Sequence, residues 1–261
     1  MSGETPVAGD FWSPLRTATR SRIGLGRAGD ALPTNEVLAL RGAHAVARDA
    51  VHLPWDAEAI EAGLGARGLE VLHVHSAAAD RAEYLRRPDL GRRPETLEHL
   101  PAPEAGTHDV VLVLADGLSA RAQDQHGVAL TAALVDALHG AGLSVGPVVL
   151  ADQARVGIGD HVGQRLGATA VVVVIGERPG LSVADSLGLY LTHHPRVGRR
   201  DSERNCISNV HPPDGLTYER AAQVLTALVL GARQLGESGV RLKDVAEAVD
   251  SGQAEADAAL L

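Results

Sequence analysis

The chain has 261 residues, and its 24 Lys and Arg against 33 Asp and Glu give a formal charge of −9 at neutral pH. A chain of this length can form one large or two modest hydrophobic cores without disulfides or structural metals to stabilise them. Cys206 is the single cysteine, which excludes an intrachain disulfide and a cysteine-rich zinc site. The acidic balance and a total of one Phe, two Trp and three Tyr exclude a general nucleic-acid binder, which needs basic faces and stacking rings.

The first third of the chain has a helical pattern. Apolar residues at three- and four-residue spacing predict a helix that begins at Thr34, its N-cap, and ends at Pro54. A second helix is predicted over residues 56–65. Four prolines among the charges of residues 86–106 then indicate a domain boundary. We therefore predict a flexible leader over residues 1–10 and a helical N-terminal domain over residues 11–100.

Short apolar runs alternate with helical patterns in the remainder, residues 101–261. The run at residues 170–175 is nearly all Val and Ile without alternation, which is typical of a strand buried on both faces of a parallel sheet. We predict an α/β fold, in which a Rossmann-like, doubly wound domain with a mainly parallel sheet follows the helical one. The predicted strands are residues 109–115, 145–150, 170–175 and 187–192, and the predicted helices are residues 118–138, 158–166 and 218–235.

Two glycine-containing motifs resemble functional signatures only in part. The segment from Gly24 to Gly29 has dinucleotide-fingerprint spacing, but a basic, non-strand segment precedes it, so we interpret it as a flexible loop. The segment from Asp116 to Ala120 is similar to a nucleophile elbow, whose second glycine is here Ala120. We interpret it as a strand-to-helix turn with Ser119 near the helix start.

The histidines do not indicate a metal site. His193 and His194 are adjacent, so on a strand they are expected to face opposite sides, where they cannot easily share a metal. The segment Asp124-Gln-His126 is worth comparing with the Asp-x-His-x-x-Gly loop that supplies histidine to cobalt. The glycine position is Ala129 and the segment lies in a predicted helix, so that ligation mode is not supported.

A candidate binding turn directly follows the most buried predicted strand. Glu177 emerges there, and Pro179 fixes the turn. Ligands of open α/β sheets bind outside the carboxyl ends of the strands, so the position favours a binding role for Glu177 over a solvated surface loop.

A second candidate is the long, charged and then polar stretch over residues 196–211, whose composition suits a binding loop. Cys206 lies within it. As a nucleophile Cys206 would need a nearby base, and only His211 is close in sequence. We favour a small, neutral contact residue over a catalytic thiolate.

At these residues the sequence resembles the small subunit, or light chain, of ethanolamine ammonia-lyase. The matching segments follow the family's order over nearly the whole chain. They are Phe-Trp-Ser-Pro-Leu-Arg-Thr-Ala-Thr from Phe11, Arg-Ile-Gly-Leu-Gly-Arg-Ala-Gly to Gly29, Leu-Ala-Asp-Gly-Leu-Ser-Ala to Ala120, Ile-Gly-Glu-Arg-Pro-Gly-Leu to Leu181 and Asn-Cys-Ile-Ser-Asn-Val-His to His211.

The resemblance implies a carbon–nitrogen lyase that is active only together with a larger TIM-barrel subunit, which binds ethanolamine and carries most catalytic groups. Adenosylcobalamin in its base-on form would lie between the two subunits and start a radical deamination to acetaldehyde and ammonia. By motif, the resemblance carries three cobalamin contacts over to Val156, Glu177 and Cys206, and it implies no catalytic residue and no metal ligand from this chain.

No apolar run approaches the roughly 18–20 residues of a membrane span, so we expect a cytoplasmic protein, or one packaged in a bacterial microcompartment; the short leader before Phe11 leaves both open.

The alternative function is a stand-alone Rossmann-type enzyme that binds NAD or a nucleotide through residues 24–29. It requires a strand before Gly24 and an acidic residue about 20 positions on, for which Asp49 has the right distance.

Overall fold

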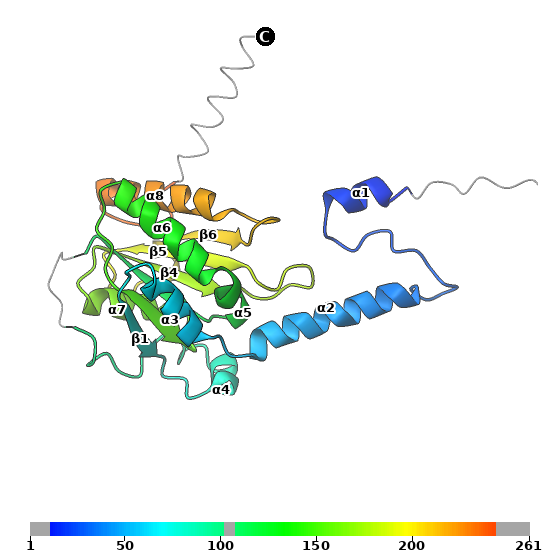
Figure 1. The fold of residues 1–261 in the computed structure, drawn as a ribbon, viewed down its shortest axis with the longest axis horizontal. Coiled ribbons are helices and arrows are strands. Elements are labelled where there is room, and N and C mark those ends of the chain that lie inside the picture. The colour runs from blue at the N-terminus through cyan, green and yellow to red at the C-terminus, as the bar shows by residue number, and fades with distance from the viewer. Residues whose placement is uncertain (1–10, 102–107, 244–261) are drawn as a thin grey trace, which may run out of the picture.

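A six-stranded sheet forms the centre of the molecule, and a long helix projects from it (Figure 1). The structure is a computed structural model that describes residues 11–101 and 108–243; the predicted leader over residues 1–10 lies outside these ranges. In chain order the elements are α1 (Ser13–Ala18), α2 (Thr34–His52), α3 (Ala57–Gly65), β1 (Val71–His75), α4 (Arg81–Arg86), β2 (Val110–Ala115), α5 (Ala120–Ala122), the π-helix η1 (Gln123–Gly127), α6 (Val128–Gly140), β3 (Val148–Asp152), α7 (Ile158–Arg165), β4 (Ala170–Gly176), β5 (Leu187–His193), the 3₁₀-helix η2 (Asp201–Glu203), β6 (Asn205–Val210) and α8 (Tyr218–Leu235).

The strands form a mixed, mainly parallel sheet in the order β1-β3-β2-β4-β5-β6. The first four strands of this order run parallel, whereas β5 pairs antiparallel with β4, and β6 pairs antiparallel with β5. The prediction of an α/β fold with a mainly parallel sheet is therefore confirmed. The Rossmann-like description and the separate helical N-terminal domain stay predictions.

Helices cover both faces of the central strands, which explains the unbroken apolar run of β4. Val172 and Val174 pack into a core shared with helices α3, α6 and α8, while Val171 and Val173 pack into a second core shared with α7. Because alternate side chains of a strand point to opposite faces, both sets must be apolar. No helix in the described part of the chain is long and apolar enough to span a membrane.

Strand β6, at one edge of the sheet, is covered on one face only. On β6, Ile207 and Val210 are buried in the core beneath α8, whereas Cys206 and Ser208 are exposed on the other face. The interpretation of residues 196–211 as one binding loop is thus wrong for its second half, which is strand β6. Its two buried apolar residues among exposed polar ones suit a half-buried strand at the edge of a sheet, although an irregular pairing, with Asn209 at a φ of 66°, interrupts the alternation.

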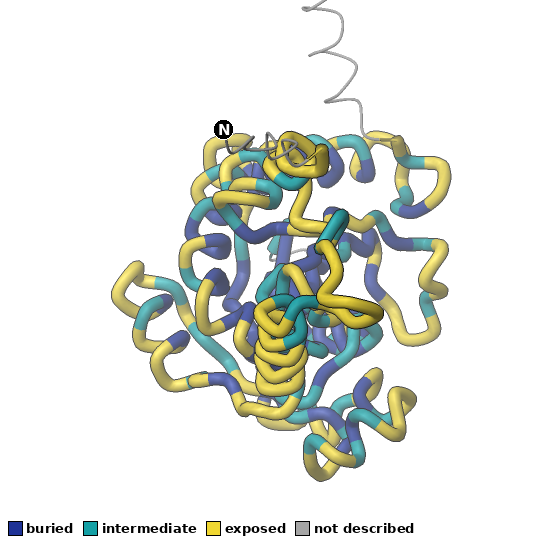
Figure 2. Tube along the Cα trace, turned by 90° about the vertical axis from the view of Figure 1, so that its right-hand side faces the viewer, coloured by how far each residue is buried: buried dark blue, intermediate teal, exposed yellow. Residues whose placement is uncertain are grey.

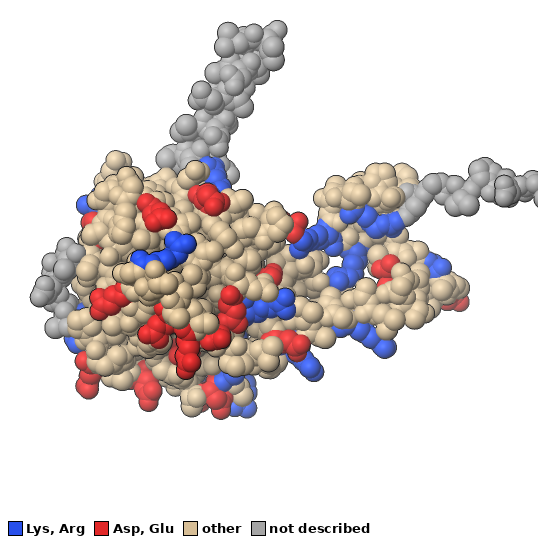
Figure 3. Space-filling model, in the orientation of Figure 1, with Lys and Arg blue, Asp and Glu red and all other residues tan. Residues whose placement is uncertain are grey.

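The N-terminal arm, residues 11–53, extends away from the sheet. Helix α2 buries only Ala50, and Figure 2 shows the helix exposed along most of its length. The arm carries more basic than acidic side chains, in contrast to the acidic surface below the sheet (Figure 3). Thr34 is the first helical residue and makes no side-chain cap, so its prediction as the N-cap is wrong; Pro33 occupies that position.

Two histidines at the end of β5 differ from the expectation. His193 is 3% exposed and ends the strand, whereas His194 leaves it with a φ of 46°, which brings the two ring centroids to 4.1 Å. The expectation that they face opposite sides is therefore wrong. Burial, followed by the positive charges of His194, Arg199 and Arg233, lowers the pKa of His193 to about 4.

We expect this histidine to make the fold acid-sensitive. The pKa of a histidine in the unfolded chain is about 6.5, so between pH 6.5 and 4 the unfolded state binds a proton that the folded state excludes. Stability therefore falls as the pH falls, by about 2 kcal/mol from this group between pH 7.5 and 5. Denaturant unfolding at the two pH values should show a smaller difference for His193→Gln. The matched control is His44→Gln on exposed α2, and equal pH dependence in both variants would contradict the assignment.

Candidate functional site

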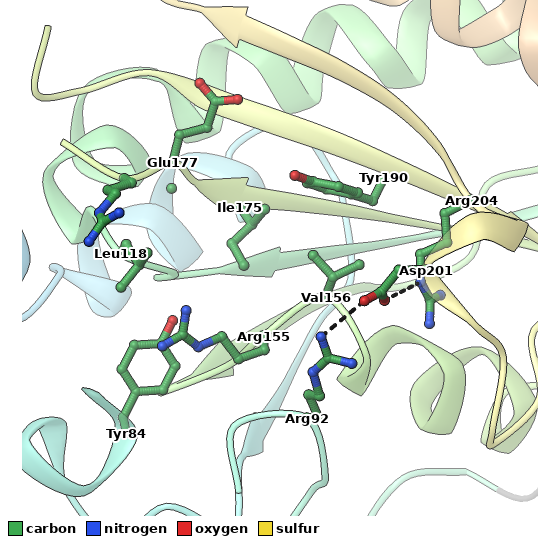
Figure 4. A pocket seen from close by; sticks show the side chains of 12 residues that line it. Tyr84, Arg92, Leu118, Arg155, Val156, Ile175, Glu177, Tyr190, Asp201 and Arg204 are labelled. Carbon is green, nitrogen blue, oxygen red and sulfur yellow. Dashed lines mark hydrogen bonds and ion pairs between the residues drawn. The ribbon is translucent and has the colours of Figure 1, made fainter. Parts of the chain in front are cut away.

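A cleft of about 630 Å³ opens at the carboxyl ends of β3 and β4 and extends under β5 (Figure 4). Its floor is formed by apolar side chains that follow or end these strands, and charged side chains gather at its two ends. The lining residues are Tyr84, Arg92, Leu118, Arg155, Val156, Ile175, Gly176, Glu177, Arg178, Tyr190, Asp201 and Arg204.

The turn after β2 fixes the end of β4. The backbone N–H of Leu118 donates to the carbonyl of Gly176 over 2.9 Å, and a Cβ on Gly176 would lie 2.1 Å from the carbonyl oxygen of Ser119. Only glycine permits this approach. The Ser119 hydroxyl accepts the N–H of Ala122 and caps α5, which confirms the predicted strand-to-helix turn.

Glu177 follows β4 directly and reaches across β5. Its carboxylate accepts the backbone N–H of Asn209 on β6, with the nearer oxygen at 3.2 Å. A Cβ on Gly188 of β5 would lie 3.0 Å from Oε1 of Glu177. The glycine therefore leaves room for the carboxylate to cross the strand, a role that the sequence analysis missed because only the sheet register reveals it.

Val156 and Cys206 lie on either side of Tyr190. Val156 follows β3, is partly buried and lines the cleft. Cys206 is the second residue of β6 and pairs with Tyr190, which also lines the cleft. The structure thus brings Val156 and Glu177 to strand ends on one rim, whereas Cys206 lies level with the middle of β5, on the uncovered face.

The side chain of Cys206 is exposed and has no base beside it. Its Sγ lies 3.2 Å from Oγ of Ser208, while His211 instead contacts Oδ1 of Asn209 over 2.8 Å. The geometry favours the contact residue over the nucleophile. Burial, with the adjacent Cys206 as the next cause, raises the pKa of Tyr190, so its phenol is a neutral hydrogen-bond donor at neutral pH.

Arginines dominate the charged ends of the cleft. Arg92 pairs with Asp201 over 3.1 Å, and Arg204 pairs with Asp160 over 2.7 Å. Arg155 lies over the ring of Tyr84, with 4.2 Å between its Cζ and the ring centroid. Asp201 and Arg204 belong to the charged stretch over residues 196–211 that the sequence indicated as a binding segment. Sequence reasoning missed Tyr84, Arg92 and Arg155, because they come from segments far apart in the chain whose convergence depends on the sheet order.

The residues of the nucleotide-binding alternative do not form its required unit. The element before Gly24 is helix α1 rather than a strand, and Gly24, Gly26 and Gly29 each have a positive φ within a loop. Asp49 lies in α2, as expected. The loop interpretation holds, and the strand that a dinucleotide fingerprint needs is not present at this point of the described chain.

Nothing in the described ranges gathers three or more potential metal ligands. The segment Asp124-Gln-His126 lies in η1, in agreement with the predicted helix. The Nδ1 atom of His126 lies 2.7 Å from the hydroxyl of Tyr218, and burial lowers the pKa of this histidine. His126 is thus a buried, hydrogen-bonded side chain.

Comparison with known proteins gives a consistent family. Residues 9–243 match the family described as ethanolamine ammonia-lyase light chain (EutC). The chain is 56% identical over 247 residues to the ethanolamine ammonia-lyase small subunit of Rhodococcus erythropolis, with 94% of this chain and 95% of the relative covered. It is 51% identical to that of Ralstonia nicotianae, over 94% and 93% of the two chains, and 50% identical to that of Azotobacter vinelandii, over 95% and 93%.

Proposed function

The chain belongs to the ethanolamine ammonia-lyase light-chain family, and on this premise we propose that it is the cobalamin-binding small subunit of such a lyase. A small subunit implies a large one. In this proposal the large subunit is a TIM barrel that binds ethanolamine, and adenosylcobalamin lies between the two chains. The complex deaminates ethanolamine to acetaldehyde and ammonia.

The observation that carries the proposal is a one-sided cleft with an uncovered sheet face beside it. Protein pockets of roughly 300–1,000 Å³ enclose most of a drug-sized ligand. The cleft has about 630 Å³ and is open, so it encloses only part of a much larger corrinoid. This chain would therefore supply one wall of the site, and a partner chain would supply the other.

The residues present fit the cofactor. The Glu177 carboxylate is half-exposed beside the cleft and can accept hydrogen bonds from corrin amide groups, while its bond to Asn209 holds it in place. Val156 offers a small apolar contact at the opposite wall. Cys206 offers the same on the uncovered face, with the neutral phenol of Tyr190 between them.

The chain's contribution to the reaction is placement. The bound cofactor supplies the radical chemistry through homolysis of its cobalt–carbon bond, and the protein supplies orientation and electrostatics. Glu177, Val156 and Cys206 orient the corrin and exclude water from this side. We assign no proton transfer to this chain, because the cleft holds no nucleophile paired with a base.

The test is reconstitution with the large subunit. We expect the purified complex with adenosylcobalamin to form acetaldehyde from ethanolamine, and each chain alone with the cofactor to form none. Corrinoid binding, followed by absorbance, should likewise require both chains. Turnover by the isolated chain, or binding of NAD by it in calorimetry, would contradict the proposal and favour the stand-alone enzyme.

A further inference from the structure

We propose that Arg155 and Arg178 form an anion subsite in the cleft, which binds the phosphodiester of the cobalamin nucleotide tail. This inference rests on the proposed function and adds two residues to it. Arg155 directly precedes Val156 at the end of β3, and Arg178 directly follows Glu177 at the end of β4. Both arginines line the cleft, so the subsite would adjoin two of the proposed cobalamin contacts.

Arg155 is held in place before any ligand arrives. Its backbone N–H donates to the carbonyl of Gly91 over 2.8 Å. Its side chain also packs closely on Gly91, since a Cβ on that glycine would lie only 2.8 Å from Cγ of Arg155. The guanidinium stacks on the ring of Tyr84, which is fully buried and donates through its hydroxyl to the carbonyl of Ala154. Figure 4 shows the Arg155 side chain lying along this ring inside the cleft. Such a fixed guanidinium loses little freedom on binding.

The charge of Arg155 is not neutralised within the described chain. Arg92 and Arg204, the other arginines of the cleft, pair with Asp201 and Asp160. No ion pair or side-chain hydrogen bond joins Arg155 to another described residue, and its Nε is buried without a partner. Tyr84 does not supply an anion, because burial raises the pKa of its phenol even though Arg155 opposes that rise.

Arg178 adds a second cation, exposed to solvent, to the first. It is exposed on the turn after β4, and no ion pair within the described ranges involves it. The chain as a whole carries nine more acidic than basic residues, so two arginines without carboxylate partners at one cleft mark a local reversal of charge. Guanidinium groups bind phosphate oxygens in bidentate geometry.

Among the polar groups of cobalamin, the phosphodiester is the one that suits the two arginines. The side chains of the corrin end in neutral amides, which suit the carboxylate of Glu177. The nucleotide tail carries the anionic group, which suits a guanidinium. Besides the ion-paired side chains at its other end, the cleft thus offers the Glu177 carboxylate and two guanidinium groups, which follow strands β3 and β4 on either side of β2. The polar parts of cobalamin can be matched to these groups without burying an unpaired charge.

The experiment compares two corrinoids on the assembled complex of both subunits. Adenosylcobalamin has the phosphodiester, and adenosylcobinamide lacks the nucleotide tail that contains it. We expect Arg155→Gln to weaken binding of adenosylcobalamin by about 10- to 100-fold, the usual range for a lost hydrogen bond to a charged group. Binding of adenosylcobinamide should change less than about 3-fold on the same scale. Arg178→Gln should show the same selectivity with a smaller loss.

Arg93→Gln is the matched control, since Arg93 is exposed and does not line the cleft. Equal loss for both corrinoids in the Arg155 variant would overturn the inference, because it would mean that Arg155 only supports the cleft through Tyr84. If that variant does not assemble, Arg178→Gln decides by the same comparison. Failure of the unaltered complex to bind either corrinoid would instead overturn the proposed function.

Discussion

Replacing Arg204 with methionine is expected to lower the free energy of unfolding by about 3–5 kcal/mol. The guanidinium donates two hydrogen bonds to the carboxylate of Asp160, over 2.7 and 2.8 Å, and a third to Oγ1 of Thr192. The two charged side chains are 3% and 4% exposed. Arg204→Met leaves the Asp160 carboxylate buried without its counter-charge, and that uncompensated charge is the reason for the large cost. Urea unfolding followed by circular dichroism measures it.

Two comparisons separate this cost from the loss of a side chain. Arg87→Met breaks an ion pair with Asp89 of similar length, 2.8 Å, whose members are more than half exposed. Because water screens such a surface pair, its loss should leave the free energy of unfolding nearly unchanged. The double variant Arg204→Met with Asp160→Leu should recover at least half of the loss, because it leaves no buried charge. A double variant as unstable as the single one would show that packing, not charge, is decisive here.

The second large effect concerns Glu177. We expect Glu177→Ala to weaken cobalamin binding by the two-subunit complex about 10- to 100-fold, because a charged acceptor of hydrogen bonds is removed from the cleft. Glu177→Gln keeps the shape and one acceptor oxygen, so its loss should be smaller. Spectrophotometric titration of the complex with adenosylcobalamin measures both.

The same variants test whether the role of Glu177 is structural. The carboxylate also accepts the N–H of Asn209, so Glu177→Ala has some cost in stability, which we expect to be about 1–3 kcal/mol. Glu58→Ala, on the exposed side of α3, is the matched control for both measurements. An unchanged affinity combined with an unstable or unassembled subunit would assign Glu177 to the fold rather than to the cofactor.

The central elements could be predicted because their patterns are local. The apolar run that became β4 and the helix that became α8 begin at the predicted residues, Ala170 and Tyr218. A strand that is buried on both faces requires apolar side chains at every position, and the resulting unbroken apolar run can be recognised from the sequence alone. The binding turn at Glu177 followed from the same run, because it lies directly after it.

The edge elements could not be predicted in the same way. Strand β1 contains His73 and His75 among three apolar residues and lies within the segment whose pattern indicated helices. Strand β6 has only two buried residues, and its Cys206 and Ser208 are exposed. Both lie at the edges of the sheet, where one face or one side meets solvent. Polar residues are tolerated there, so the sequence pattern of an edge strand is hard to distinguish from that of a loop.

The sequence by itself determined the family, the α/β class, the buried central strands and the turn that carries Glu177. Each of these depends on residues that are neighbours in the chain. The tertiary structure decided that Cys206 lies on an uncovered sheet face beside Tyr190, that Gly188 gives the Glu177 carboxylate its path, and that Arg155 lies unpaired on Tyr84. These contacts join distant segments, and only the strand order and register of the folded sheet fix their distances.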